Sequence, residues 1–168
     1  MREIVVVDQK WGIGKNNDLL FSLPEDMAFF RSETTGKVVV MGSNTLKSLP
    51  GGNPLKNRTN IVLFPGGEKR DDCIIVDSLD ELFVELAKYN SDDIYIMGGA
   101  MFYRTMLPHC DTAFVTKVDA DGEAQVFFEN LDEHPDFECV AEGETLIDNG
   151  FEIKFTTYKN NAPRAIGG

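Results

Sequence analysis

Cysteine and histidine are scarce in this sequence, and their scarcity excludes several classes of protein. Among 168 residues there are three cysteines, Cys73, Cys110 and Cys139, and two histidines. An odd number of widely spaced cysteines argues against a disulfide framework and against a zinc cluster, and is typical of a reducing compartment. Two histidines are too few for a histidine-rich metal site. We therefore expect a cytoplasmic protein without a bound metal.

Basic residues and long apolar runs are also few. Sixteen Lys and Arg stand against 28 Asp and Glu, which gives a net charge of −12. A chain this acidic is a poor candidate for binding nucleic acid or an anionic membrane. No apolar run approaches the ~20 residues of a membrane-spanning helix, and the first residues turn acidic too early for a signal peptide. An anionic small ligand would have to be held by a few local donors.

The length and the composition predict one domain, residues 1–160, followed by a flexible tail at 161–168. Short β-branched runs alternate with helix-like stretches through the first two thirds of the chain. This alternation predicts parallel strands joined by helices, with ligands at the carboxyl ends of the strands. Strands are expected at 4–8, 37–41, 59–64, 73–76 and 93–97, and helices at 24–33, 44–49, 79–88 and 100–107.

The last third of the chain has an antiparallel pattern. Residues 112–118 are typical of a strand, and two further expected strands, 137–146 and 151–159, flank the hairpin signal Asp148-Asn149-Gly150. The predicted fold class is therefore α/β. We expect a single domain with a central, mostly parallel eight-stranded sheet, an antiparallel C-terminal hairpin and about four flanking helices.

Asp26 lies in the first turn of an expected helix. Ser22 and Glu25 have the spacing of a capping box, and Pro24 suits the start of a helix. Asp26 and Phe30 are one turn apart, so the carboxylate borders an apolar stripe. Two interpretations stay open: a solvated acid that favours the helix dipole, or a carboxylate in a ligand cleft. In a cleft it would accept two hydrogen bonds from a ring N–H and a neighbouring amino group.

Two strand–glycine–helix turns are candidates for phosphate binding. Gly98-Gly99 follows one expected strand and Gly42 follows another, with Thr45 as a hydroxyl donor nearby. Glycine lets the backbone approach a phosphate closely, and a helix N-terminus offers free N–H groups. Either turn alone could be a simple tight turn, but two in one parallel sheet suit a dinucleotide. The Gly-x-Gly-x-x-Gly fingerprint is absent, so a standard dinucleotide fold is not indicated.

A long glycine-bearing segment, residues 11–21, joins the first expected strand to the Asp26 helix. Connections of this length are usually functional or disordered, and we interpret this one as a mobile lid, with an ordinary surface loop as the alternative. Arg58 follows a loop rich in glycine and proline. It is either a solvated side chain or a two-pronged clamp for a carboxylate.

Taken in order, these stretches resemble the dihydrofolate reductase family over essentially the whole chain. The resemblance is carried by Gly12-Ile13-Gly14 with Asn17, Leu23-Pro24-Glu25-Asp26 with Phe29-Phe30, Val40-Met41-Gly42 with Thr45, Asn57-Arg58, Asn60-Ile61-Val62-Leu63, Met97-Gly98-Gly99 with Tyr103, and Thr116 with Asp119-Ala120. It implies an enzyme that uses NADPH to reduce 7,8-dihydrofolate to tetrahydrofolate in one-carbon metabolism. It further implies hydride transfer to pterin C6, water-assisted protonation of N5, antifolate binding and a monomeric state.

The resemblance also assigns roles to individual residues. The implied catalytic residues are Asp26, Phe21 and Thr116. The implied substrate-binding residues are Ile4, Val5, Asp26, Met27, Phe30, Leu55, Arg58 and Thr116, with Arg58 holding the glutamate α-carboxylate. The implied cofactor-binding residues are Val6, Ile13, Gly14, Leu19, Gly42, Ser43, Asn44, Thr45, Leu63, Phe64, Met97, Gly98, Gly99, Ala100, Met101, Phe102 and Tyr103. A cis peptide between Gly98 and Gly99 is implied as well.

Two departures from the family pattern bear on function. Phe21 stands where the family commonly has tryptophan, which removes an indole N–H near the substrate. Ser43 stands where a basic residue usually meets the adenosine 2′-phosphate, and Phe64 lies near a position where a small hydroxyl residue is usual. We therefore expect a reduced preference for NADPH over NADH, unless Lys69 or Arg70 reaches the phosphate.

Two other functions remain open. A reductase of the same fold that acts on a ribosylated pyrimidine in riboflavin synthesis would share the glycine turns, but it needs neither Asp26 nor Arg58. A non-catalytic folate- or nucleotide-binding module would bind the same ligands without turnover. Oxidation of NADPH in the presence of dihydrofolate separates these alternatives from a dihydrofolate reductase.

Overall fold

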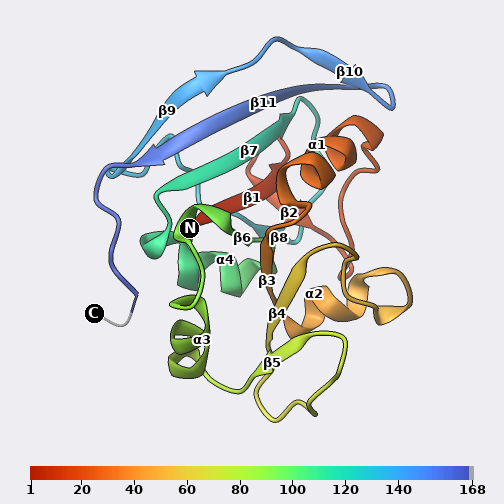
Figure 1. The fold of residues 1–168 in the computed structure, drawn as a ribbon. Helices are drawn as coiled ribbons and strands as arrows, with labels where there is room; N and C mark the ends of the chain where they lie inside the picture. The colour runs from red at the N-terminus through yellow and green to blue at the C-terminus, as the bar shows by residue number, and fades with distance from the viewer. Residues whose placement is uncertain (167–168) are drawn as a thin grey trace.

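A mixed β-sheet runs through the centre of the molecule, with helices on both of its faces (Figure 1). The computed structural model describes residues 1–166. Its main elements are β1 (Arg2–Val7), β2 (Gly12–Gly14), α1 (Pro24–Thr34), β3 (Val38–Gly42), α2 (Ser43–Ser48), β4 (Thr59–Leu63), β5 (Ile74–Val76), α3 (Leu79–Leu86), β6 (Ile94–Ile96), α4 (Ala100–Met106), β7 (Thr112–Val118), β8 (Val126–Phe127), β9 (Phe137–Glu142), β10 (Leu146–Asp148) and β11 (Phe151–Asn160).

The strand order across the sheet is β10-β11-β7-β1-β6-β3-β4-β5, and β9 pairs with the end of β11 that β10 does not reach. The strands from β7 to β5 are parallel to their neighbours, whereas β11 is antiparallel to β7, β9 and β10. Because β9 and β10 share one edge of β11, the strands occupy eight positions. The prediction of a mostly parallel eight-stranded sheet with an antiparallel finish is confirmed.

The parallel strands are apolar on both faces because helices cover both. Val38 and Val40 belong to the cluster that contains side chains of α3 and α4, whereas Val39 and Met41 pack with side chains of α1 and α2. This alternation follows from the two-residue period of a strand. An uninterrupted apolar run such as residues 38–41 therefore marks a strand inside a two-sided core.

The C-terminal hairpin forms where the sequence predicted it, but one strand prediction was wrong. Asn149 and Gly150 both have positive φ, 49° and 85°, as a tight two-residue hairpin requires. The single strand expected at 137–146 is divided into β9 and β10, and the Gly143 N–H between them donates to Phe155 O at 2.9 Å. The two pieces pair with different parts of β11, so the edge of the sheet is not one continuous strand.

The predicted lid is fastened to the domain along its first half. β2 pairs with β8, and the Asn16 N–H donates to Gln125 Oε1 at 2.9 Å. At its base, the buried Asp8 carboxylate accepts from Gly12 N at 2.7 Å and from Gly122 N at 3.0 Å. The second half is open, since Leu19 is 74% exposed. The mobility of this segment stays a prediction.

The beginning of the predicted C-terminal tail lies against the domain. Asn161 N donates to Asp136 O and Arg164 N to Pro108 O, each at 2.8 Å. The end of the predicted tail, 167–168, lies outside the described residues. None of the helices in residues 1–166 combines the length and the hydrophobicity that a membrane-spanning helix requires.

Candidate active site

Asp26 and Thr116 are 90 residues apart in the chain and meet where α1 crosses the sheet. Thr116, buried on β7, donates its hydroxyl to Asp26 Oδ1 at 2.7 Å. Asp26 is half-buried in the first turn of α1. Of the two sequence-based interpretations, the structure favours a carboxylate held against the sheet over one in bulk solvent.

In the absence of a ligand, the surroundings of the Asp26 carboxyl disfavour its ionised form. Burial raises the pKa of the Asp26 carboxyl, the Thr116 hydrogen bond lowers it, and the nearby Asp148 carboxylate raises it; the pKa is raised overall. A ligand that brings two N–H donors would replace the lost solvation. The site therefore suits an amidine-like edge.

The predicted capping box at the start of α1 does not form. The N-cap residue is Leu23, which has an apolar side chain and cannot cap the helix N–H groups. Leu23 is instead buried with Val118 and Ile153, so packing fixes the path of the chain into the helix. The Asp26 N–H, left free by this arrangement, donates to Asp148 Oδ2 at 3.1 Å.

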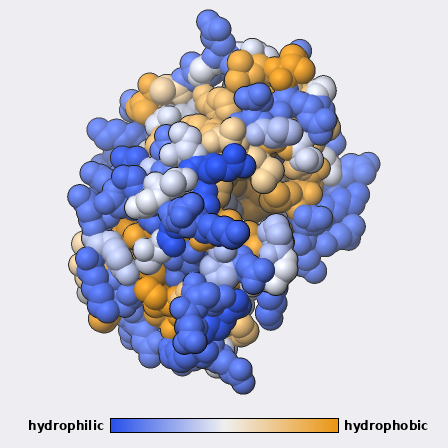
Figure 2. Space-filling view, turned by 45° about the vertical axis from the view of Figure 1, so that its right-hand side comes forward, coloured by the Kyte–Doolittle hydropathy of each residue, from blue (hydrophilic) through white to orange (hydrophobic). Residues whose placement is uncertain are grey.

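Apolar side chains and one guanidinium extend the site beyond Asp26. Phe30 and Leu55 pack against the cluster that contains Ile4. The Arg58 guanidinium lies 5.9 Å from the Phe30 ring centroid, and its Nε donates to Thr34 Oγ1 at 3.1 Å. Figure 2, turned so that the side bearing α1 and α2 comes forward, shows a recess with apolar surface between hydrophilic rims.

The two glycine turns lie next to each other. Gly42 N donates to Gly98 O at 2.9 Å, and the Gly98–Gly99 peptide is cis, as the resemblance implied. Gly42 and Gly99 are the N-caps of α2 and α4, and neither helix has a side-chain cap, so their first N–H groups are available. Gly98 has φ 126°, and a Cβ there would lie 3.3 Å from Thr45 Oγ1. The turns form a narrow backbone cradle with a hydroxyl beside it.

Strand β1 connects the Asp26 region to this cradle. The Tyr103 hydroxyl, buried on α4, donates to Ile4 O at 2.7 Å. Val5 and Phe102 are buried in the core cluster, so they offer little but backbone to a ligand. Met27 and Met101 are 57% and 81% exposed. The Tyr103 hydrogen bond therefore joins β1 to α4, and the predicted residues on these elements and on α1 differ widely in their exposure.

The remaining predicted residues lie on β1, α2 and α4, on the further strands β2 and β4, and in segments next to these elements. They are Val6 on β1, Ile13 and Gly14 on β2, Phe21 before α1, Ser43 and Asn44 in α2, Leu63 at the end of β4, Phe64 just after it, Met97 after β6 and Ala100 in α4.

Comparison with known proteins agrees with this arrangement. A family model described as dihydrofolate reductase matches residues 1–160. The chain belongs to the dihydrofolate reductase family. It is 31% identical to a dihydrofolate reductase of Bacillus subtilis, over 98% of this chain and 97% of that protein. It is 34% identical to one of Enterococcus faecium, over 90% and 92% of the two chains.

A solved structure of the family is also similar. The dihydrofolate reductase from Enterococcus faecalis, complexed with NADP(H) and RAB-propyl, superposes with a TM-score of 0.84 and 27% identity. The match covers 95% of each chain. The dihydrofolate reductase fold is therefore present almost in full.

The structure shows one basic residue that sequence reasoning missed. Lys47 Nζ lies 5.0 Å from the Phe64 ring centroid, and Lys47 is one helical turn after Ser43, so that spacing could have revealed it. The two basic residues that the sequence offered for the adenosine end are engaged elsewhere. Lys69 Nζ donates to Ile75 O at 2.6 Å, and Arg70 makes two hydrogen bonds of 2.8 Å to Asp72.

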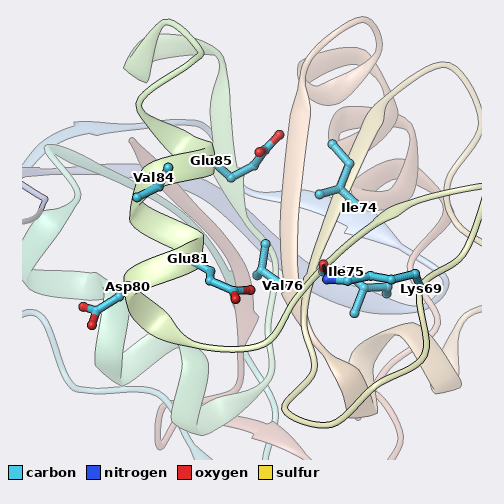
Figure 3. A pocket seen from close by; sticks show the side chains of 8 residues that line it. All are labelled: Lys69, Ile74, Ile75, Val76, Asp80, Glu81, Val84 and Glu85. Atoms are coloured by element: carbon cyan, nitrogen blue, oxygen red, sulfur yellow. Dashed lines mark hydrogen bonds between the residues drawn. The ribbon is translucent and has the colours of Figure 1, made fainter.

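A separate hollow of about 420 Å³ lies at the β5 edge of the sheet, and of the residues that the sequence offered for ligand binding only Lys69 lines it. Its lining residues, drawn in Figure 3, are Lys69, Ile74, Ile75, Val76, Asp80, Glu81, Val84 and Glu85. Lys69 lies across the outer edge of β5, where its ammonium group donates a hydrogen bond to the backbone carbonyl of Ile75. A lysine in this place protects a sheet edge from pairing with another chain.

Proposed function

We propose that this protein is a dihydrofolate reductase that uses NADPH to convert 7,8-dihydrofolate to 5,6,7,8-tetrahydrofolate, and so serves one-carbon metabolism. The observation that carries the proposal is the Asp26–Thr116 pair between α1 and β7, which is connected through β1 to the paired glycine turns. The names of the family's relatives and the NADP(H) bound in the Enterococcus faecalis structure support it.

In this proposal, Asp26 orients the substrate. Its carboxylate accepts hydrogen bonds from the pterin ring N–H and 2-amino group, while Thr116 holds the carboxylate in place. Phe30 and Leu55 form the apolar wall beside the ring. The Arg58 guanidinium, held by Thr34 near the Phe30 ring, then binds the glutamate α-carboxylate.

The residues of the glycine turns fit a dinucleotide. The free N–H groups at the starts of α2 and α4, with Thr45 Oγ1, would hold its pyrophosphate. Ile13, Leu19 and Tyr103 would enclose the nicotinamide. When bound, NADPH would supply a hydride from its nicotinamide to pterin C6, and the lid segment would exclude water from the site.

Protonation of pterin N5 is assigned to water. Asp26 is committed to the edge of the ring that carries the 2-amino group, so it fixes the ring and favours the protonated pterin. Phe21 packs against Phe151 with ring centroids 4.9 Å apart and has no N–H to hold a water molecule. The water would therefore be held by backbone groups or by the substrate.

We also propose a reduced preference for NADPH over NADH. Ser43 carries no charge, and Lys69 and Arg70 are bound to other groups. One hydrogen bond from a charged group is worth only ~1.5–3 kcal/mol. Comparing kcat/KM for the two cofactors at one salt concentration tests this proposal, and a ratio above ~1000 would contradict it.

The decisive test of function is the dihydrofolate-dependent oxidation of NADPH, followed by absorbance with and without an antifolate. We expect turnover that the antifolate abolishes. Absence of turnover with a folded protein that still binds both ligands would instead indicate a non-catalytic binding module. We further propose a monomer, on the family resemblance, and a cytoplasmic location, on the few and widely spaced cysteines. The acidic composition supports the proposal that the protein binds neither nucleic acid nor membranes. Sedimentation equilibrium tests the monomer.

A further inference from the structure

The tip of the β10–β11 hairpin lies against the start of α1, although more than 120 residues separate them. We propose that Asp148, at this tip, is a positioning residue for the reduction proposed above: it fixes the backbone of Asp26 and sets the charge environment of its carboxylate. The proposal rests on the proposed function only for what Asp26 does with substrate.

Three contacts join the hairpin tip to the segment that carries Asp26. Asp148 Oδ2 accepts from Asp26 N at 3.1 Å. Asn149 Nδ2 donates to Ser22 O at 2.9 Å. The rings of Phe151 and Phe21 meet edge to face, 4.9 Å apart. All three contacts reach residues in α1 or just before it, so the hairpin holds residues 21–26 at three points.

Asp148 performs the capping that α1 does not provide for itself. A helix begins with N–H groups that lack partners, and a carboxylate is the strongest acceptor available to them. Leu23 at the N-cap supplies none, and Asp148 is only 2% exposed. A buried carboxylate is costly unless hydrogen bonds compensate for its lost solvation. The hydrogen bond from Asp26 N compensates for part of this cost, so the fold holds the Asp148 carboxylate at the start of α1.

The same hairpin also supports the other partner of Asp26. Asp148 pairs with Phe151 in the turn, and further along β11 Phe155 pairs with Thr116 on β7. Thr116 in turn donates to the Asp26 carboxylate. One continuous element thus fixes the backbone of Asp26 from one end and its side chain from the other.

Within residues 1–166, the Asp26 carboxylate is influenced by the Thr116 hydroxyl from β7 and by the Asp148 carboxylate from β10. The Tyr103 phenol on α4 donates its hydroxyl to Ile4 O and interacts with the Asp26 charge only through space. Burial is the largest cause that raises the pKa of Asp26, and the negative charge of Asp148 raises it further. Asp148 therefore disfavours the ionised form of the Asp26 carboxyl when no ligand is bound. A ligand with two N–H donors would stabilise that ionised form.

The test compares Asp148→Asn and Asp148→Ala with wild type and with Glu152→Gln, which removes a charge from an exposed position of the same hairpin. The Asp26 carboxyl is titrated by carbon-13 NMR in the free protein. We expect a lower Asp26 pKa in Asp148→Asn, where the amide oxygen keeps the hydrogen bond but the charge is gone. Glu152→Gln should match wild type.

Kinetics separate positioning from general stability. In Asp148→Ala we expect kcat/KM for dihydrofolate to fall about tenfold or more, the loss expected for a hydrogen bond to a charged group. The Kd for NADPH should be unchanged, and Asp148→Asn should recover most of the loss. If Asp148→Ala does not fold, the Asn variant and its titration decide alone.

An unchanged Asp26 pKa in Asp148→Asn would overturn the proposal. So would an Asp148→Ala enzyme as efficient as Glu152→Gln. Because the titration uses the free protein, it reports on Asp148 even if the wild type did not reduce dihydrofolate. That latter result would refute the proposed function and not the role of Asp148 beside Asp26.

Discussion

Replacement of Glu3 by leucine is predicted to stabilise the protein. Glu3 lies on β1 in the middle of the sheet, is fully buried, and its two carboxyl oxygens have no hydrogen-bond partner among residues 1–166. It is flanked in the sheet by Ile96 and Ala113. Burial raises the pKa of Glu3 well above its usual range. The carboxyl is therefore kept in its neutral form to higher pH than an exposed one.

The expected gain follows from the unpaired oxygens. A buried polar group without a partner costs ~1–3 kcal/mol, and leucine has a similar volume. Glu3→Leu should therefore raise the free energy of unfolding by about 2 kcal/mol near neutral pH. For a chain of this size, 1 kcal/mol shifts Tm by roughly 2–4 °C, so the expected increase is about 4–8 °C.

The gain should depend on pH with a definite sign. The pKa of Glu3 is higher in the folded state than in the unfolded state, where glutamate has a pKa of ~4.3. The free energy of unfolding of the wild type is therefore unaffected by this difference below the unfolded pKa, and it decreases as pH rises from there to the folded pKa. The loss approaches ~1.4 kcal/mol per pH unit in that interval. Glu3→Leu has no such loss, so its advantage over wild type should widen as pH rises.

Urea unfolding followed by circular dichroism, repeated between about pH 5 and pH 8, measures both effects. Glu152→Leu, which removes an exposed carboxylate from β11, is the control and should change stability by no more than ~0.5 kcal/mol. If Glu3→Leu were less stable than wild type, or if its advantage did not change with pH, the reasoning from burial would be refuted.

Three further substitutions test the site. Asp26→Asn should fold and bind NADPH normally but lose most turnover at neutral pH, because the amide cannot form the charged pair with the pterin; full activity would contradict its role. Arg58→Gln should raise KM for dihydrofolate roughly tenfold or more and leave kcat nearly unchanged, since it removes binding common to the ground and transition states. Lys47→Met should lower the ratio of kcat/KM for NADPH to that for NADH by about tenfold, because Lys47 is the cation beside Phe64; equal ratios in both proteins would exclude it from contact with the 2′-phosphate.

Local sequence signals were sufficient for many elements of the fold, but not for the division of residues 137–146 into β9 and β10. The β-branched run at residues 37–41 predicted a strand, and Asp148-Asn149-Gly150 predicted the hairpin, because both signals depend on neighbouring residues only. The strand–glycine–helix turns at Gly42 and Gly98 were visible for the same reason.

Only the tertiary structure could decide which distant groups meet. Asp26 accepts a hydrogen bond from Thr116 and donates one to Asp148, and these residues lie 90 and 122 positions later in the chain. No local pattern at residues 22–26 distinguishes this arrangement from a capping box. Glu3, a charged residue that sequence reasoning would place in solvent, is buried because its neighbours on β1 are held between β6 and β7. Periodicity determines which residues share a face of an element, whereas the packing of the whole sheet determines what that face contacts.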